Sequence, residues 1–349
     1  MFTGHTEVAD LALLVRVSRM YYERGMTQQE IARATGLSRP TISRLLDRAK
    51  RSGIVEIRIL DPAQDAQSLA DALARRFRLR RVVLADPSGG AEDNPRQRVG
   101  RAVAEYLQAQ LRDGMTLGMA WGRTLREMAL VLKPAHLANL TIVQMMGGLA
   151  ALEDSLDTTG LAQEVGRALG GRTVQFLAPA LVESPEVRRR ILSTPEVRQA
   201  MEFLRRLDAA VVGIGAISPH VALVERGYVT AEAMAKCRRL GGRGEMLLQF
   251  FDADGHPMIG LNRRVIGMSL RDLARVPLVI AGVSGPPDKS EAVLAALRGR
   301  LVHVLITDVE TARRVLRRAN REEQTTKQIT PTRHIELGNP TRRRKNLAG

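Results

Sequence analysis

Two groups of residues in this chain have the types and the spacing to bind anions, and the first lies near the amino terminus. A short basic helix is expected after Ser38, with hydroxyl and guanidinium groups on its outer side. Hydroxyls hydrogen-bond to base edges, and arginine offers paired donors to guanine as well as charge to phosphate. We therefore expect base contacts from Thr41, Ser43 and Arg44. Phosphate contacts, which set the register without reading sequence, are expected from Gln28, Arg39 and Arg48.

The second group follows apolar runs that are typical of buried strands. Trp121-Gly122-Arg123-Thr124 comes directly after one such run and opens a helical pattern. The free N–H groups of a helix N-terminus, together with donors from Arg123 and Thr124, could hold an oxyanion such as phosphate. Gly147-Gly148 ends the next apolar run in a similar way. The spacing around Gly122 is equally typical of an ordinary strand-to-helix turn with a satisfied cap, so both interpretations stay open.

Other combinations of reactive residues are weaker. Gly213-Ile-Gly215 lacks the third glycine of a dinucleotide-binding loop, because Ser218 stands in that place, so no NAD is expected. Asp252, Asp254 and His256 lie close together, but the Asp-Gly pair within residues 250–257 predicts a hairpin turn, and no further His or Cys has the spacing of a metal ligand. Cys237 is the single cysteine and is expected to be a buried apolar side chain. The sequence thus implies no cofactor, no metal and no catalytic residue.

A scaffold for the basic helix is visible in the pattern that precedes it. Thr27 and Glu30 have the spacing of a capping box, which predicts a helix that runs to Thr35. Gly36 can take a positive φ and close a tight turn, and Ser38 can cap the following helix. Two short helices joined by such a turn form a helix-turn-helix.

Apolar residues on the second of these helices fall on one side and would pack inward, leaving the arginines outside. They are Ile42, Leu45, Leu46 and Ala49. After Gly53, alternation of apolar and polar residues over 55–59 predicts a half-buried strand, such as a wing. An alternative is a three-helix unit whose arginines only solubilise it or contact another protein.

From about residue 69 to 319, runs rich in Val, Ile and Leu alternate with helical patterns, which is typical of parallel strands and crossover helices. The expected strands are 81–86, 115–120, 140–147, 173–180, 209–217, 246–252, 277–283 and 301–308. We therefore predict an α/β fold, with an N-terminal helix-turn-helix domain and a larger, mainly parallel α/β domain. Ligands of such sheets bind beyond the carboxyl ends of the strands.

Composition divides the 349 residues into four parts. The expected helix-turn-helix domain is 1–60, and a linker at 61–68 is indicated by Pro62 and its small polar neighbours. The ligand-binding and oligomerisation domain is 69–319. The basic tail 320–349 has few apolar residues and is expected to be mostly disordered.

The charge balance indicates the class of partner. The chain has 53 Lys and Arg against 37 Asp and Glu, a net charge of +16, which favours a polyanion. Aromatic residues make up only 3%, too few for a single-strand stacking surface, so a DNA duplex is expected. No apolar run reaches the roughly 18 to 20 residues of a membrane span, and the amino terminus does not look like a signal peptide. We expect a cytoplasmic protein without a membrane partner.

The segment TQQEIARATGLSRPTISRLLDRAKRSGIVEIRI resembles the helix-turn-helix of SorC-family bacterial transcriptional regulators, and the chain to about residue 319 is similar to that family's sugar-binding domain. The resemblance implies the fold of ribose-5-phosphate isomerase and glucosamine-6-phosphate deaminase, used for ligand binding instead of catalysis, and dimers or tetramers on DNA. The residues that it implies for sugar or phosphate binding are Gly122, Arg123, Thr124, Glu245, Lys289 and Arg226.

These observations predict a sequence-specific transcriptional regulator whose operator affinity is controlled by a sugar or a phosphorylated sugar. Because one helix-turn-helix is a weak reader, at least a dimer is expected. One alternative is a sugar-phosphate isomerase or deaminase with a DNA-binding appendage, which would need a base over the sugar carbon. Another is an interaction module whose helices bind RNA polymerase.

Overall fold

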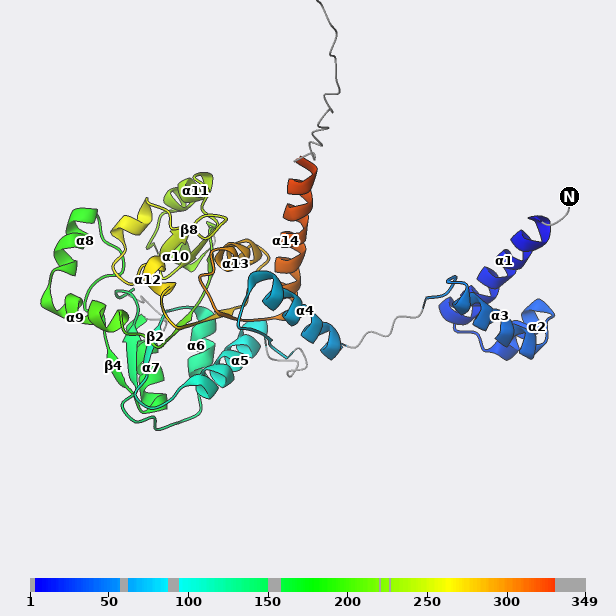
Figure 1. Cartoon of the computed structure of the whole chain (residues 1–349), viewed down its shortest axis with the longest axis horizontal. Helices are drawn as coiled ribbons and strands as arrows, with labels where there is room; N and C mark the ends of the chain where they lie inside the picture. The colour runs from blue at the N-terminus through cyan, green and yellow to red at the C-terminus, as the bar shows by residue number, and fades with distance from the viewer. Residues whose placement is uncertain are drawn as a thin grey trace, which may run out of the picture. The chain divides into compact units, whose positions relative to one another are not determined.

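A computed structural model of the full chain describes residues 4–56, 62–86, 94–149, 158–219, 221–225 and 227–329. They belong to two compact units, Met1–Asp65 and Ala66–Gly349 (Figure 1). Each unit has its own apolar core. None of the described helices is long and apolar enough to cross a membrane.

The smaller unit is helical, and its helices begin and end where local signals predict. Its elements are α1 (Gly4–Ser18), the π-helical turn η1 (Arg19–Glu23), α2 (Gln28–Thr35) and α3 (Arg39–Arg51). The capping box is present, since Thr27 accepts from the Glu30 N–H while the Glu30 carboxylate accepts from the Thr27 N–H. Gly36 has a φ of 72°, and Ser38 caps α3. The predicted helix-turn-helix is therefore confirmed.

The core of the smaller unit explains which side of α3 faces outward. Ile42, Leu46 and Ala49 are buried, and Ile42 and Leu46 pack with Val17 and Ile31 from the two other helices. Leu45 is half-buried against the same core. The strand expected at 55–59 falls mostly on 57–61, outside the described residues.

The larger unit is built on a seven-stranded sheet in which every pair of strands is parallel. The order is β1-β10-β9-β5-β2-β3-β4. The strands are β1 (Arg81–Leu84), β2 (Thr116–Met119), β3 (Thr141–Gln144), β4 (Arg172–Val174), β5 (Ala209–Val212), β9 (Leu278–Val283) and β10 (Val304–Thr307). Every residue of β3, β5 and β10 is buried, as expected when helices cover both faces of a parallel sheet. The predicted α/β class is confirmed.

Helices connect these strands and form the outer layers. They are α4 (Pro62–Phe77), α5 (Pro95–Gln110), α6 (Arg123–Leu130), α7 (Thr158–Leu169), α8 (Pro185–Leu192), α9 (Pro195–Leu204), α10 (Ala222–Glu225), α11 (Ala231–Arg239), the 3-10 turn η2 (Leu261–Arg264), α12 (Leu270–Leu273), α13 (Lys289–Arg298) and α14 (Val309–Ile329). Cys237 is buried on α11, as predicted.

The prediction of one strand over 246–252 was wrong. A second, antiparallel sheet contains β6 (Gly215–Ala216), β7 (Gly244–Met246) and β8 (Gln249–Phe251). Leu247 and Leu248 reverse the chain between β7 and β8, with φ values of 57° and 60°. The sequence hid this turn because both leucines are buried and leucine is not a typical turn residue. The turn expected at 250–257 is present, with Phe251 paired to Pro257.

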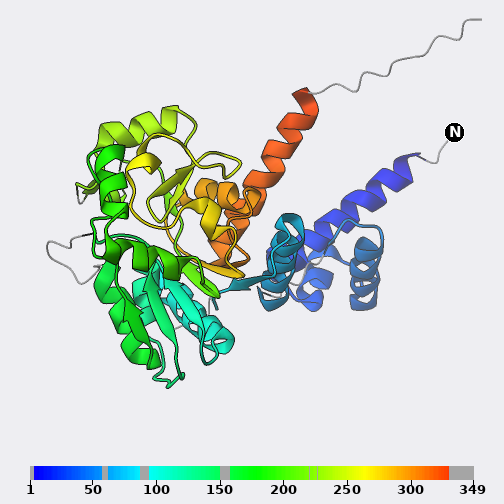
Figure 2. The same cartoon turned by 60° about the vertical axis from the view of Figure 1, so that its left-hand side comes forward.

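Two boundaries also differ from the prediction. The segment expected to be a linker at 61–68 lies within α4 from Pro62 onward, because proline fits a first helical turn and Leu69, Ala70 and Leu73 pack on the main core. The tail expected from residue 320 is helical to Ile329, since α14 continues there with ion pairs such as Arg298–Glu322. Its outer end projects from the larger unit in Figures 1 and 2. Residues 330–349 lie outside the described part.

Candidate ligand pocket and nucleic-acid interface

The main pocket lies where the order of the parallel strands changes direction. From β2 the chain moves outward through β3 to β4, and then returns to β5 on the other side of β2. Connections therefore diverge at this point and leave a crevice at the carboxyl ends of the strands. The pocket is lined from the segments after β2, β5 and β9, and holds about 880 Å³ including solvent at its mouth.

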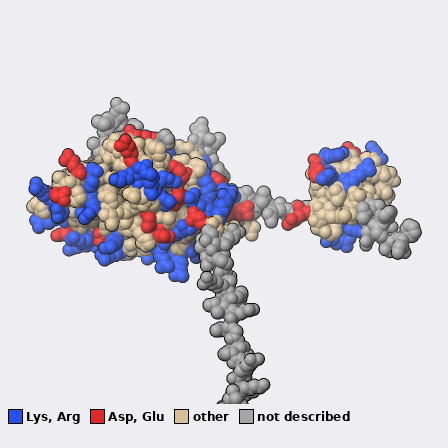
Figure 3. All heavy atoms as spheres, turned by 90° about the horizontal axis from the view of Figure 1, so that it is seen from above, with Lys and Arg blue, Asp and Glu red and all other residues tan. Residues whose placement is uncertain are grey.

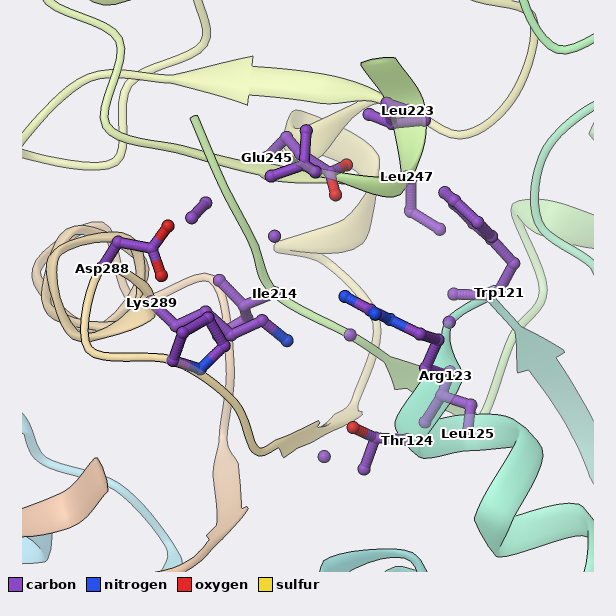
Figure 4. Close-up of a pocket in the computed structure, with 18 residues that line it drawn as sticks. Trp121, Arg123, Thr124, Leu125, Ile214, Leu223, Glu245, Leu247, Asp288 and Lys289 are labelled. Atoms are coloured by element: carbon purple, nitrogen blue, oxygen red, sulfur yellow. The ribbon is translucent and has the colours of Figure 1, made fainter. Parts of the chain in front are cut away.

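An open helix N-terminus forms one side of the pocket. Gly122 is the N-cap of α6, has a φ of 150°, and has no side chain with which to cap the helix. The first N–H groups of α6 therefore have no side-chain partner from the cap, which argues against the ordinary capped turn. Thr124 is buried at this end, and the Arg123 side chain extends into the pocket (Figure 4). This arrangement suits an anion.

Glu245 and Lys289 come from other elements to the same pocket. Glu245 is on β7 and buried, and its Oε2 accepts a hydrogen bond from the Leu248 N–H at 3.2 Å. Lys289 is the first residue of α13, and its Nζ donates to the Ser284 carbonyl at 3.0 Å. In Figure 4 the Arg123 guanidinium and the Lys289 ammonium point toward one another across the pocket.

Burial shifts the pKa values of Glu245 and Lys289 toward pH 7. It raises the pKa of Glu245 to about 7, against the opposing effects of the Leu248 N–H and the Lys289 charge. Burial also lowers the pKa of Lys289 to about 8, helped by the positive charges of Arg123 and Arg96 and opposed by Glu245 and Asp288. Both groups can therefore change charge near pH 7. The two neighbouring arginines affect the pKa of the Lys289 ammonium more than the two neighbouring carboxylates do.

Gly215 leaves the space that the Glu245 side chain occupies. Gly215 pairs with Glu245 between β6 and β7, and a Cβ at Gly215 would collide with the Glu245 carboxylate. Gly215 is the second glycine of the Gly213-Ile-Gly215 motif. The motif therefore provides space for a buried acid, a role that sequence reasoning about dinucleotides missed.

An apolar wall completes the pocket. Trp121, Leu223 and Leu247 lie together on one side of it (Figure 4). Leu223 and Leu247 are buried, and both were missed because neither stands next to a motif in the sequence. Asp288, also missed, lines the side near Lys289. The pocket thus offers cations, one buried carboxyl group and a flat apolar surface.

Of the eight residues expected to bind the ligand, five come together here, two lie elsewhere and one is outside the described residues. Gly122, Arg123, Thr124, Glu245 and Lys289 line the pocket. Gly147 and Gly148 do not line it, and serve backbone packing: the Gly147 N–H donates to the Ile266 carbonyl, and Gly148 pairs with Pro179. A Cβ on Gly147 would lie 2.5 Å from the Pro179 carbonyl, which explains the glycine. Arg226 lies outside the described residues.

The residues expected to contact DNA lie at the start of α2 and along α3. Arg39, Arg44 and Arg48 are exposed, and Gln28, Thr41 and Ser43 are half-buried. The Thr41 hydroxyl lies 2.8 Å from that of Ser38, so it takes part in the cap of α3. The Arg44 Nε donates to the Pro40 carbonyl at 3.4 Å, which keeps its guanidinium near the helix start. Lys and Arg side chains are visible on the surface of both units in Figure 3.

Comparison with known proteins identifies both units. Residues 61–317 match the family described as "Putative sugar-binding domain", and residues 17–65 match the MarR family. The transcriptional regulator LsrR of Klebsiella pneumoniae is 31% identical over 88% of this chain and 94% of its own length. The deoxyribonucleoside regulator of Bacillus subtilis is 29% identical over 86% of this chain and 96% of its own length.

Solved structures show the same similarity. The full-length sorbitol operon regulator SorC from Klebsiella pneumoniae has a TM-score of 0.67 and 28% sequence identity, and the match covers 88% of this chain and 99% of that chain. The similarity therefore extends over both units and not over the sugar-binding domain alone.

Proposed function

The chain belongs to the SorC family of transcriptional regulators with a sugar-binding domain, and from this premise we propose that its pocket binds a phosphorylated sugar that controls binding of α3 to operator DNA. The observation that carries the proposal is the convergence of Arg123, Lys289 and Glu245 at the open N-terminus of α6. The N–H groups of α6, Arg123 and Lys289 would bind the phosphate, and Glu245 would bind a sugar hydroxyl.

Two of the regulators that this chain resembles are named for compounds that contain or are related to sugars, namely a deoxyribonucleoside regulator and a sorbitol operon regulator. We extend this to the chain itself as a sugar of the same general kind. The apolar wall of Trp121, Leu223 and Leu247 suits the C–H face of a sugar ring or chain.

On the DNA side, α3 would lie in the major groove, with Thr41, Ser43 and Arg44 at base edges and Gln28, Arg39 and Arg48 at phosphates. Because one such helix reads few base pairs, the working form would be at least a dimer on two half-sites. The ligand controls DNA binding only if it prefers one arrangement of the subunits, typically by about 1–3 kcal/mol. Such a regulator would act in the cytoplasm, where the bacterial chromosome lies.

The chain supplies its own probe for the test. Trp121 lines the pocket and is the only tryptophan of the 349 residues. Titration of the full chain with a panel of sugars and their phosphates should change the Trp121 fluorescence for the true ligand. The same compound should change gel retardation of the chain's own upstream DNA over the same concentration range. A compound that fills the pocket without any effect on DNA binding would contradict the control mechanism.

The interface is tested with two substitutions on α3. Arg44→Ala should abolish specific retardation, whereas Arg48→Ala should weaken specific and competitor DNA alike, because phosphate contacts carry no sequence information. Equal loss on both DNAs with Arg44→Ala would move Arg44 to the phosphate-binding group. Unchanged DNA binding with both variants would favour a protein partner, such as RNA polymerase.

We also propose that the pocket binds its sugar without converting it, in line with relatives that are named as regulators. Glu245 makes a direct assay worthwhile, since a buried carboxyl group with a pKa of about 7 could act as a base. Incubation with sugar phosphates should give binding but no isomerised or deaminated product. Turnover that is lost with Glu245→Gln would support the enzyme alternative.

A further inference from the structure

A second helix N-terminus lies beside the open end of α6. Helices α5 and α6 pack against each other, and Gly100 of α5 contacts the backbone of Glu127 and Met128. Farther along, the Gln108 side chain bonds to the backbone of Lys133, which follows α6. The order of these contacts is the same along both helices, so α5 and α6 run parallel and start at the same end. One turn before Gly100, Arg96 is therefore level with Arg123, which is one turn before Glu127.

The two helix ends differ in how their N–H groups are satisfied. Asn94 caps α5 and accepts from the N–H groups of Arg96 and Gln97, while the Gln97 side chain accepts from the Asn94 N–H. The α5 backbone is thus already occupied, in contrast to that of α6, which begins at Gly122. Any contribution of α5 to an anion site must come from a side chain.

The Arg96 side chain is the part of α5 that could contribute to an anion site. Arg96 is half-buried, and among the described residues no hydrogen bond or ion pair of its guanidinium is seen. Its pKa is lowered by burial and by the charge of Arg123, with Glu127 opposing. Arg96 and Arg123 together lower the pKa of Lys289 more than Glu245 and Asp288 raise it. The positive charges of Arg96 and Arg123 therefore both act on Lys289, and the two carboxylates offset them only in part.

We propose that Arg96 is a further anion-binding residue of the pocket, which reaches from α5 to the same phosphate group that Arg123 and Lys289 bind. This inference rests on the proposed function, because it assumes that the ligand is phosphorylated. A charged hydrogen bond from a half-buried guanidinium strengthens anion binding and relieves the repulsion among the three cations. Arg96 is not among the residues that line the pocket, so its side chain would turn toward the bound anion.

Inorganic phosphate is a sufficient probe. Phosphate should raise the melting temperature of the full chain and change the fluorescence of Trp121, both in a saturable way. Arg96→Gln should weaken phosphate binding about ten-fold or more, the usual effect of losing one charged hydrogen bond. Arg101→Gln is the matched control, since Arg101 is an exposed arginine of the same helix and the charge change is equal. It should leave phosphate binding within about two-fold of the original.

A pH profile separates anion binding from a merely structural role. Loss of a neighbouring cation should raise the pKa of Lys289, which Arg96 lowers. Phosphate binding that depends on the charged ammonium should then persist to higher pH in Arg96→Gln than in the original chain. A substitution that only loosened α5 would weaken binding without moving the alkaline midpoint.

The inference is overturned if Arg96→Gln binds phosphate as tightly as the original while Arg123→Gln does not, or if the original chain shows no response to phosphate. These outcomes are distinct from failure of the proposed function. If a neutral sugar releases the chain from DNA and phosphate does not bind, the chain is still a sugar-controlled regulator, but Arg96 has no role in ligand binding. Phosphate binding that depends on Arg96, without any sugar that affects DNA, would leave the anion site but remove the control of DNA binding.

Discussion

At the scale of single residues, the pocket depends on two ionisable groups whose pKa values burial brings close together. Glu245 has its pKa raised to about 7 and Lys289 has its pKa lowered to about 8. Each group keeps a hydrogen bond from or to the backbone, at Leu248 and Ser284 respectively. A ligand that carries both a hydroxyl and an anionic group would satisfy them together, which is why we propose a sugar phosphate as the ligand.

Glu245 makes the stability of the larger unit depend on pH. Its pKa in the folded state is above the ordinary value of 4.5, so its contribution is full below about pH 4.5 and is lost as the pH rises through about 7. Glu245→Gln removes the cost of ionising the buried carboxyl group. We expect this variant to melt at a higher temperature than the original at pH 8, by about 2–4 °C per kcal/mol gained, and at nearly the same temperature at pH 4.5.

The matched control for this experiment is Glu105→Gln, an exposed acid on α5. Its melting temperature should equal that of the original chain at both pH values. An advantage of Glu245→Gln that is equal at pH 4.5 and pH 8 would contradict the assigned ionisation, because only the charged form is disfavoured by burial.

The glycine opposite Glu245 gives a second prediction. Gly215→Ala should lower stability by about 1–3 kcal/mol, because the new methyl group would collide with the Glu245 carboxylate, and should displace that side chain from the pocket. Gly213→Ala is the natural control, since its nearest neighbour, the Trp121 carbonyl oxygen, would be at an ordinary 3.6 Å. Thermal unfolding of both variants tests this. Equal losses would show that Gly215 is no more restricted than Gly213.

At the scale of elements, α14 connects the pocket to the helix that follows the smaller unit along the chain. Glu291, in the first turn of α13, forms ion pairs with Arg238, Arg243 and Arg318 at 2.9–3.1 Å. Arg243 stands two residues before Glu245, and Glu291 two residues after Lys289, so this cluster joins the segments that carry both pocket groups. Arg318 lies on α14, so its ion pair with Glu291 joins α14 to this cluster.

The residues of α14 that directly follow Arg318 hold α4. Arg76 of α4 donates to the Asn320 side chain at 2.7 Å and to the Ala319 carbonyl at 3.1 Å, and pairs with Glu323 at 2.8 Å. We expect Arg76→Ala to leave ligand binding, measured by Trp121 fluorescence, within about two-fold while it reduces the change in DNA affinity that the ligand causes. A coupling residue of this kind typically alters the response by about 0.5–2 kcal/mol.

The neighbour Arg75 provides the control, because it is exposed on α4 and has none of these contacts with α14. Arg75→Ala should keep the full response to the ligand. If Arg76→Ala also responds fully, the contact between α4 and α14 has no part in the coupling, and the ligand must act through another element.

At the scale of the whole molecule, DNA binding should depend on more than one copy of α3. A duplex that contains both half-sites of the operator should bind the full chain about 100-fold or more tightly than a duplex with one half-site destroyed, because the second contact is then made at high effective concentration. Fluorescence anisotropy at fixed salt measures this, since phosphate contacts make affinity depend strongly on salt. Equal affinities for the two duplexes would indicate a monomeric reader.

Local signals in the sequence determined much of this fold. The capping box of Thr27 and Glu30, the turn at Gly36 and the apolar side of α3 involve residues within about one helical turn of one another, so their physics is readable from the chain alone. The buried parallel strands were also predictable, because continuous runs of Val, Ile and Leu are typical of a sheet covered on both faces. The sequence left open whether the helix that follows Gly122 has a side-chain cap, and the structure shows that it has none.

Only the tertiary structure decided which distant residues share the pocket. Trp121, Leu223 and Leu247 form one wall because the strand order places the ends of β2 and β5 side by side, with the β7–β8 turn beside them, and no local pattern records that order. Gly147 and Gly148 look like ligand-binding glycines in the sequence, yet the close backbone of Pro179 accounts for Gly147, and Gly148 pairs with Pro179 outside the pocket. The physical reason is that a cap or an apolar stripe is stabilised within one segment, whereas a pocket and the pKa values inside it depend on burial among segments far apart in the chain.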